Sequence, residues 1–506
     1  MTRLIIKYFF SVLFFASSLF PQNFIKKINY NYEKSDSAFL TNTLGIIEGK
    51  EFTVPVVEEA ISTLLDYFEN SGFPFASIQI VSVYFHADST EQKNYADIHL
   101  NISKGEPGRF DKIIIDGSTK TKDYVILREL RNVQANLYSQ KKIDEIPALL
   151  NRLRFFEPVE RPIYYINSKN EGVLKIIVKE KETNNFDGVV GYVPSSSTNE
   201  KGFFTGYVNI SLRNLFGTGR AAAVRWLQEN RNSQELEVRY IEPWLFSYPF
   251  NIEMDLFQRK QDSTYVQRTF EGKIDFLATQ EITASFSINT RSTIPTERKN
   301  KIFTVYNSDA LTTGFNFKID TRDDFYAPTR GFFLINSYKY TSKSINGPAG
   351  YISPSTKTKV NFQRLEVDFA YFQKIFNGQI LAAGIHAREL RGSDAEVSDM
   401  YFLGGTNSLR GYREKQFNAG RIAWTNLEYR YLLSRRSFAF LFFDTGYYLR
   451  NENAENNITK LEGFKIGYGL GLNIETGLGV LGVSFALAKG DSFSDGKIHF
   501  GIVNEF

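Results

Sequence analysis

Residues 364–371 read Arg-Leu-Glu-Val-Asp-Phe-Ala-Tyr, so apolar and polar side chains alternate along the stretch. The same period of two recurs at residues 282–289 and 235–240. Successive side chains of a strand point to opposite faces, so each stretch predicts a strand with one apolar and one strongly polar face. A soluble sandwich also alternates, but it rarely carries Arg, Glu and Asp in succession on one face. A membrane barrel requires this pattern, because lipid satisfies no polar group and a wet lumen does.

The spacing of such stretches predicts an all-β transmembrane barrel of about sixteen antiparallel strands over residues 184–506, an even number as bacterial barrels have. Their connections alternate between short and long. The short ones are residues 214–218, 374–377, 434–436 and 476–477, and the long ones are 292–308, 344–358, 391–418 and 450–462. Short periplasmic turns and long external loops produce this alternation, which places the preceding residues in the periplasm.

Composition excludes several other classes of protein. The 506 residues include 60 basic and 56 acidic side chains, a net charge of +4, which gives no case for nucleic-acid binding. The absence of cysteine excludes disulfide scaffolds, thiol catalysis and cysteine-based metal sites. A mean hydropathy of −0.28 excludes a bundle of transmembrane helices.

Catalytic motifs are also missing from the sequence. The four histidines stand in no paired metal spacing, residues 217–220 lack the Gly-Lys-Ser/Thr ending of a phosphate loop, and no Gly-x-Ser-x-Gly elbow occurs. We therefore expect no enzymatic activity, no cofactor and no metal. His386 is interpreted as a polar position that faces the lumen.

The first 21 residues have the pattern of a secretory signal peptide. Arg3 and Lys7 precede an apolar run at residues 8–15, and the small residues Ala16, Ser17 and Ser18 follow. A basic start, a short apolar stretch and small residues are typical of such a signal. We expect cleavage within residues 18–22 and export of the mature chain.

Two small α+β domains are predicted before the barrel, at residues 22–106 and 107–183. In the first, an apolar stripe over residues 57–68 predicts a helix, with Thr53 as its N-cap, Pro55 in its first turn and Gly72 beyond its end. Strands are expected at residues 24–32, 75–85 and 95–103. The second domain repeats the plan, with strands at 111–116 and 173–179 and a helical stripe at 146–153. Pro147 is expected in the first turn of that helix, because at a later position it would kink the helix.

The pair of α+β units resembles two polypeptide-transport-associated (POTRA) domains, although two unrelated binding modules would give a similar pattern. The longest loop carries a more specific signature, Gly-Gly-Thr-Asn-Ser-Leu-Arg-Gly-Tyr at residues 404–412. Residues 214–219, 328–331, 428–430 and 443–446 supply further motifs in the same order. Together these features resemble the bacterial outer-membrane insertase and translocase superfamily, the BamA/TamA-like proteins with POTRA domains and a surface-antigen-type barrel.

The resemblance implies a set of site residues. In that family an Arg-Gly-aromatic motif lies in a loop that folds back into the barrel, between the eleventh and twelfth strands. It implies a lumen loop motif and, at the chain end, a C-terminal assembly signal at Phe506. The motif residues are Gly404, Gly405, Leu409, Arg410, Gly411 and Tyr412.

The residues themselves predict the partners of Arg410. Glu428 and Asp444 each lie on the polar face of a predicted strand, and the two strands are neighbours. Two inward carboxylates need a cation, and a guanidinium can bond both. The alternative is that Arg410 is solvated on an external loop while the carboxylates pair with Arg430 or Arg388.

The resemblance implies a protein that inserts or translocates polypeptides at the outer membrane. Its expected partners are the lipid bilayer, unfolded outer-membrane or secreted client polypeptides and periplasmic accessory proteins. Gly188, Gly191 and Pro194 in the first barrel strand predict a weak seam between the first and last strands. The alternatives are a two-partner-secretion-type transporter, ranked second because a strand-like stretch at residues 24–32 stands where a plug helix is usual, and a passive porin.

Overall fold

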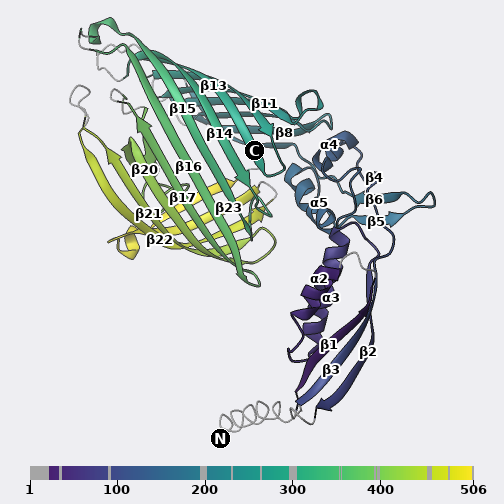
Figure 1. Ribbon diagram of the computed structural model, residues 1–506. Helices are drawn as coiled ribbons and strands as arrows, with labels where there is room; N and C mark the ends of the chain where they lie inside the picture. The colour runs from purple at the N-terminus through teal and green to yellow at the C-terminus, as the bar shows by residue number, and fades with distance from the viewer. Residues whose placement is uncertain are drawn as a thin grey trace. The chain divides into compact units, whose positions relative to one another are not determined.

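The computed structural model of the chain is shown in Figure 1. It describes residues 22–32, 37–88, 93–193, 202–228, 232–261, 265–295, 305–352, 354, 356–392, 395, 399–452, 459–476 and 479–503. The predicted signal peptide and Phe506 lie outside the described residues. No helix in these ranges combines the length and the apolar character needed to span a membrane.

The first α+β unit has a three-stranded sheet. In chain order its elements are β1 (Asn23–Asn31), α2 (Ser37–Gly45), α3 (Val54–Asn70), β2 (Ser77–Asp88) and β3 (Lys93–Ser103). The strand β3 is central, parallel to β1 and antiparallel to β2. The predicted helical stripe is confirmed, because Val57, Leu64 and Phe68 are buried against the core. Pro55 lies in the first turn and Thr53 is the N-cap residue, both as expected, although the Thr53 side chain makes no capping hydrogen bond.

The second α+β unit also has a three-stranded sheet, in the order β4-β6-β5. Its elements are β4 (Lys112–Asp116), α4 (Asp123–Leu127), α5 (Gln140–Leu153), β5 (Ile163–Ile166) and β6 (Gly172–Ile177). The expectation for Pro147 is wrong, because α5 begins at Gln140 and the proline lies in the helix interior. Buried Ile143 and Ile146 precede the proline and buried Leu150 follows it, so packing holds both halves of the helix in place.

A carboxylate after β6 ties the chain to the segment that follows β4. Glu180 accepts hydrogen bonds from the Thr119 hydroxyl at 2.7 Å and from the backbone N–H groups of Lys120 and Thr121 at 2.9 and 2.6 Å. Burial raises the pKa of Glu180, but these hydrogen bonds to the charged form outweigh burial and lower the pKa to about 2.

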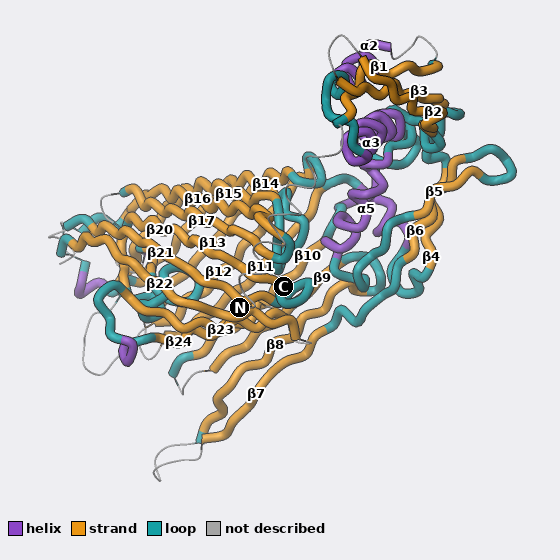
Figure 2. The backbone as a smooth tube through the Cα atoms, turned by 90° about the horizontal axis from the view of Figure 1, so that it is seen from below, coloured by secondary structure: helices purple, strands orange, loops and turns teal. Residues whose placement is uncertain are grey.

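Among the described residues that follow, sixteen strands form one antiparallel sheet, which confirms the predicted fold class. Strands adjacent in the chain pair with each other, except that β17 pairs with β20 across the longest loop. Within the described residues no ladder joins the two edge strands, β7 and β24; Figure 2 labels both. The strands are β7 (Asn185–Val193), β8 (Phe203–Leu215), β9 (Arg220–Gln228), β10 (Gln234–Glu242), β11 (Phe250–Gln261), β12 (Tyr265–Leu277), β13 (Ile282–Pro295), β14 (Asn307–Asp320), β15 (Gly331–Gly347), β16 (Lys359–Phe376), β17 (Gln379–Arg391), β20 (Arg421–Leu432), β21 (Phe438–Arg450), β22 (Leu461–Thr476), β23 (Gly479–Ala488) and β24 (Lys497–Val503).

Burial in this sheet is the reverse of that in a soluble protein. On β13, Ser285 and Ser287 are buried, whereas Phe286 and Ile288 are 49% and 46% exposed. Large apolar side chains on the outer surface suit hydrocarbon, and polar side chains on the inner face suit a wet lumen. The apolar residues of the alternating sequence pattern therefore face lipid, and the polar residues face the lumen.

Candidate functional site in the barrel lumen

The loop between β17 and β20 folds back onto the inner face of the barrel wall. It contains a short hairpin of β18 (Tyr401–Leu403) and β19 (Phe417–Ala419), which the sequence analysis did not predict. The hairpin residues Leu403 and Phe417 form a buried cluster with Leu409 and Tyr412 of the motif and with Trp424 of β20. Leu409 is fully buried. Apolar packing thus holds the motif against the wall.

Arg410 lies among the carboxylates that were predicted to receive it. Its Nε and Nη2 donate to the two oxygens of Asp444, each at 2.7 Å, and its Nη1 donates to Glu428 at 2.7 Å. The backbone N–H of Arg410 also donates to Asp444 at 3.1 Å. Arg410 is 7% exposed and Asp444 is fully buried. This geometry is a bidentate, charge-assisted pair with a third bond to a neighbouring strand.

The alternative of a solvated Arg410 is contradicted by this burial, but part of that alternative is present. Arg430 donates from Nε to the second oxygen of Glu428 at 2.8 Å, so Glu428 serves two cations. Arg388 pairs instead with Asp368 at 2.8 Å. The guanidinium of Arg410 also lies 3.8 Å from the ring centre of Phe442, a cation–π distance.

Two motif glycines are required by the backbone. Gly405 has φ +104°, and a Cβ there would lie 2.1 Å from a carboxylate oxygen of Glu414. Gly411 has φ +90°, and a Cβ there would lie 2.8 Å from the backbone carbonyl of Leu487 on β23. Only glycine adopts such positive φ values at low cost. At Gly411 the obstruction is also backbone, whereas the Glu414 side chain beside Gly405 can move aside. Gly404 also has a positive φ, of +112°.

Three further residues of the barrel wall contact the motif and were not predicted. The backbone N–H of Gly411 donates to Nε2 of His499 on β24 at 3.0 Å, and the Tyr412 hydroxyl donates to the carbonyl of Ile466 at 3.1 Å. A Cβ on Gly467 would lie 1.9 Å from the carbonyl oxygen of Arg410. The position of His499 on the polar face of the last strand was the available signal in the sequence.

The contacts make the loop a tie across the wall from β20 to β24. Glu428 is on β20, Asp444 on β21, Ile466 and Gly467 on β22, Leu487 on β23 and His499 on β24. The residues of this site hold the loop against the wall. In the described ranges no three His, Cys, Asp or Glu side chains are grouped as metal ligands.

The fold and this loop define a class of protein, a transmembrane β-barrel with an Arg-Gly-aromatic loop tucked inside and POTRA repeats before it. Residues 214–506 match the Omp85 superfamily domain, and residues 24–105 and 108–181 each match the POTRA family, described as a surface antigen variable number repeat. The chain belongs to the Omp85 superfamily. It is an outer-membrane protein whose POTRA domains lie in the periplasm.

A relative and two solved structures are similar to this chain. The outer membrane protein assembly factor BamA of Nitratidesulfovibrio vulgaris is 22% identical over 484 residues, which are 90% of this chain and 57% of the relative. The chain thus spans little more than half the length of that relative. BamA of Haemophilus ducreyi lacking POTRA domains 1–3 superposes with a TM-score of 0.52 at 15% identity, covering 95% of this chain and 98% of the other. CdiB from Escherichia coli superposes with a TM-score of 0.52 at 12% identity, and the superposition covers 95% of this chain and 90% of CdiB. At these identities the superpositions show the fold alone.

Proposed function

We propose that this protein inserts or translocates other polypeptides at the outer membrane, without covalent chemistry or a cofactor. The observation that carries the proposal is the tie from Arg410 to His499. The loop is anchored to β20 and β21 by Glu428 and Asp444, and its Gly411 reaches β24, an edge strand of the barrel sheet. A passive pore has no need for a loop fixed to a sheet edge.

The sheet edges supply a physical mechanism. The ladder between β23 and β24 covers only seven residues of β24, and within the described ranges β24 has no partner on its other side. An unpaired edge presents N–H and C=O groups that template another strand. On β7, Gly188 and Gly191 weaken the opposite edge. A client strand added at either edge would be released into the bilayer as the next strand forms.

The first POTRA domain offers a third edge. The strand β2 is an outer strand of its sheet, and Val81, Tyr84 and Phe85 on it are 67%, 64% and 51% exposed. Exposed β-branched and aromatic residues on an edge strand suit the addition of an extended peptide. We infer that unfolded outer-membrane or secreted polypeptides bind here first, together with periplasmic accessory proteins.

The second candidate is a two-partner-secretion-type transporter, which the similarity to CdiB favours. Both candidates use POTRA domains and a barrel, but they differ in the fate of the client. An insertase leaves a folded client in the membrane, whereas a secretion transporter delivers it to the other side. A porin, the third candidate, conducts ions with no dependence on a client.

The test uses the full chain in liposomes with a denatured outer-membrane barrel as client. Wild type should accelerate the folding of the client, which is measured by its heat-modifiable migration on a gel. Deletion of residues 22–183 should abolish the acceleration. Tyr84→Lys with Phe85→Lys should weaken it, and Tyr124→Lys, an exposed aromatic outside β2, serves as the matched control. Client found inside the liposome lumen favours secretion. Unchanged client folding after the deletion, with steady ion conductance, would favour the porin.

A further inference from the structure

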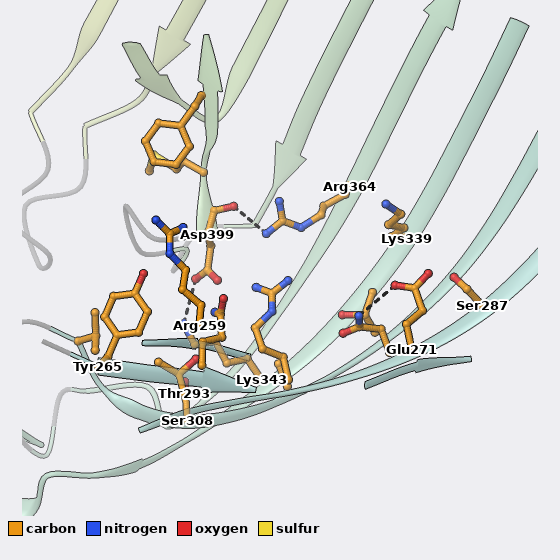
Figure 3. A pocket seen from close by; sticks show the side chains of 18 of the residues that line it. Arg259, Tyr265, Glu271, Ser287, Thr293, Ser308, Lys339, Lys343, Arg364 and Asp399 are labelled. Atoms are coloured by element: carbon orange, nitrogen blue, oxygen red, sulfur yellow. Dashed lines mark hydrogen bonds and ion pairs between the residues drawn. The ribbon is translucent and has the colours of Figure 1, made fainter. Parts of the chain in front are cut away.

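A second feature of the lumen lies apart from the Arg410 site. A cavity of about 580 Å³ is lined by strands β11 to β16 and by Asp399, Met400 and Phe402 of the long loop. Figure 3 shows side chains from several strands that converge on it. None of Arg410, Glu428 or Asp444 lines this cavity. Its volume lies within the range of small-molecule sites.

The lining of the cavity is positively charged. The acidic lining residues number three, namely Glu271, Glu366 and Asp399. The basic lining residues number six, namely Arg259, Arg291, Lys339, Lys343, Arg364 and Lys415. This excess of positive charge favours an anionic ligand, because a concave site with walls of low dielectric concentrates the field of its charges.

Two carboxylates of the cavity are already engaged by ammonium groups. Lys343 pairs with Asp399 at 3.0 Å, with both side chains almost fully buried, and Lys339 pairs with Glu366 at 3.3 Å. Glu271 accepts a hydrogen bond from Asn289 at 3.1 Å. The negative charge of the lining is thus largely neutralised by lysines.

Of the three arginines, Arg259 pairs at 3.3 Å with Glu235, which does not line the cavity. The other two guanidinium groups have no carboxylate of their own. Arg364 donates to the backbone carbonyl of Asp399 at 2.7 Å and lies 5.3 Å from the ring centre of Tyr401. Across the described residues, no carboxylate lies within ion-pair distance of Arg364 or Arg291, and Arg291 makes no hydrogen bond. An arginine that faces a lumen cavity without a partner is suited to bind an anion, because its fork matches phosphate and carboxylate oxygens.

Neutral polar groups surround these cations. The hydroxyl-bearing residues Tyr265, Ser287, Thr293 and Ser308 line the cavity, and so does the amide residue Asn289. Hydroxyls and amides beside a cationic centre match the hydroxyls of a sugar that carries a phosphate.

We propose that this cavity binds a phosphorylated sugar, with the phosphate on Arg291 and Arg364 and the sugar hydroxyls on Asn289 and its neighbours. Phosphate fits the excess positive charge better than a single carboxylate does, because it brings close to two negative charges. The ligand would bridge β13 to the start of the long loop, since Arg364 already holds Asp399. Its source is either a soluble sugar phosphate or the headgroup of a phosphorylated glycolipid in the outer leaflet.

The experiment is calorimetric titration of the full-length protein in detergent micelles with glucose 6-phosphate, glucose and inorganic phosphate. We expect binding of glucose 6-phosphate to be at least tenfold tighter than that of inorganic phosphate, and no heat from glucose. Arg291→Gln should weaken binding at least tenfold. Arg225→Gln is the matched control, because Arg225 pairs in register with Glu237 on the barrel wall outside the cavity. The same weakening by Arg225→Gln, or no binding of either phosphate probe, would overturn the proposal.

Two further arms complete the test. Arg291 makes no hydrogen bond among the described residues, so its replacement should leave heat-modifiable migration unchanged and its binding result can be interpreted directly. Competition of glucose 6-phosphate by nanodiscs containing a phosphorylated glycolipid would identify the headgroup as the source. Absence of competition would identify the soluble sugar.

Discussion

The replacement of Arg410 by alanine is the most direct test of the loop. Three charge-assisted hydrogen bonds from the side chain are lost, two to buried Asp444 and one to Glu428. Breaking a buried ion pair by removing one partner costs about 3 to 5 kcal/mol. In the variant, Asn426 still donates to Asp444 and Arg430 still donates to Glu428, so neither carboxylate is left without a donor. The lower end of this energy range therefore applies. About 3 kcal/mol raises the undocked population of the loop roughly 100-fold.

Hydrogen–deuterium exchange in nanodiscs measures that population. The backbone amides of Arg410 and Gly411 are bonded to Asp444 and His499, so they exchange only when the loop leaves the wall. Their exchange should accelerate roughly 100-fold in Arg410→Ala. Arg239→Ala, which breaks a wall ion pair with Asp255 between β10 and β11, should leave these two amides unchanged.

The rank order of variants tests the geometry further. Asp444→Asn should accelerate exchange more than Glu428→Gln, because Asp444 accepts two side-chain bonds from Arg410 and Glu428 accepts one. Arg410→Lys should fall between wild type and alanine, since an ammonium cannot reproduce the fork. Equal, rapid exchange in wild type and Arg410→Ala would refute the docked loop, and Arg410 would then be an ordinary solvated residue.

Three other outcomes are expected. The exported chain should fractionate with the outer membrane and migrate in a heat-modifiable way; recovery as a soluble periplasmic protein would contradict the barrel. Gly467→Val should release the loop, because the Cβ would lie 1.9 Å from the Arg410 carbonyl, whereas Gly272→Val, with open space at its Cβ, should leave it docked. The charged Glu180 carboxylate protects the backbone amides of Lys120 and Thr121, and its pKa is about 2 when folded and about 4.3 when unfolded. The protection of these amides against exchange, corrected for the intrinsic rate, should therefore be constant above about pH 5. It should fall from about pH 4 towards pH 2 as Glu180 becomes protonated. In Glu180→Gln that protection should be lower at pH 7 and independent of pH over this range.

The barrel was predictable because lipid imposes a local rule. Every membrane strand must place apolar side chains outward. Residues such as Phe286 and Ile288 therefore identify the lipid-facing side of their strand, whichever strands pair with it. Register and strand order then follow from hairpin connections between chain neighbours. The α3 stripe was readable for a similar reason, since one element alone carries it.

The errors fall where packing between distant segments decides. Leu40 and Leu44 of α2 are buried, but two leucines in nine residues are too few to predict a helix from their spacing. Pro147 ends or kinks an isolated helix, yet buried side chains on both sides keep α5 continuous. The hairpin of β18 and β19 has three residues in each strand and exists only because it packs on the wall.

In the candidate site, too, local contacts were predictable and contacts between distant segments were not. The pairing of Arg410 with Glu428 and Asp444 was predictable, because strand parity alone put the two carboxylates on the same face of neighbouring strands. The contact with His499 was not, because it joins residues separated by 88 positions through a loop whose path no local rule determines. That contact gives the loop its functional meaning under the proposed mechanism. A loop bonded only to β20 and β21 would stabilise the interior of the sheet, whereas a loop bonded also to β24 holds the edge strand that a client must approach. Opening of the edge and undocking of the loop are therefore coupled, so any variant that accelerates exchange at Gly411 should also change client folding.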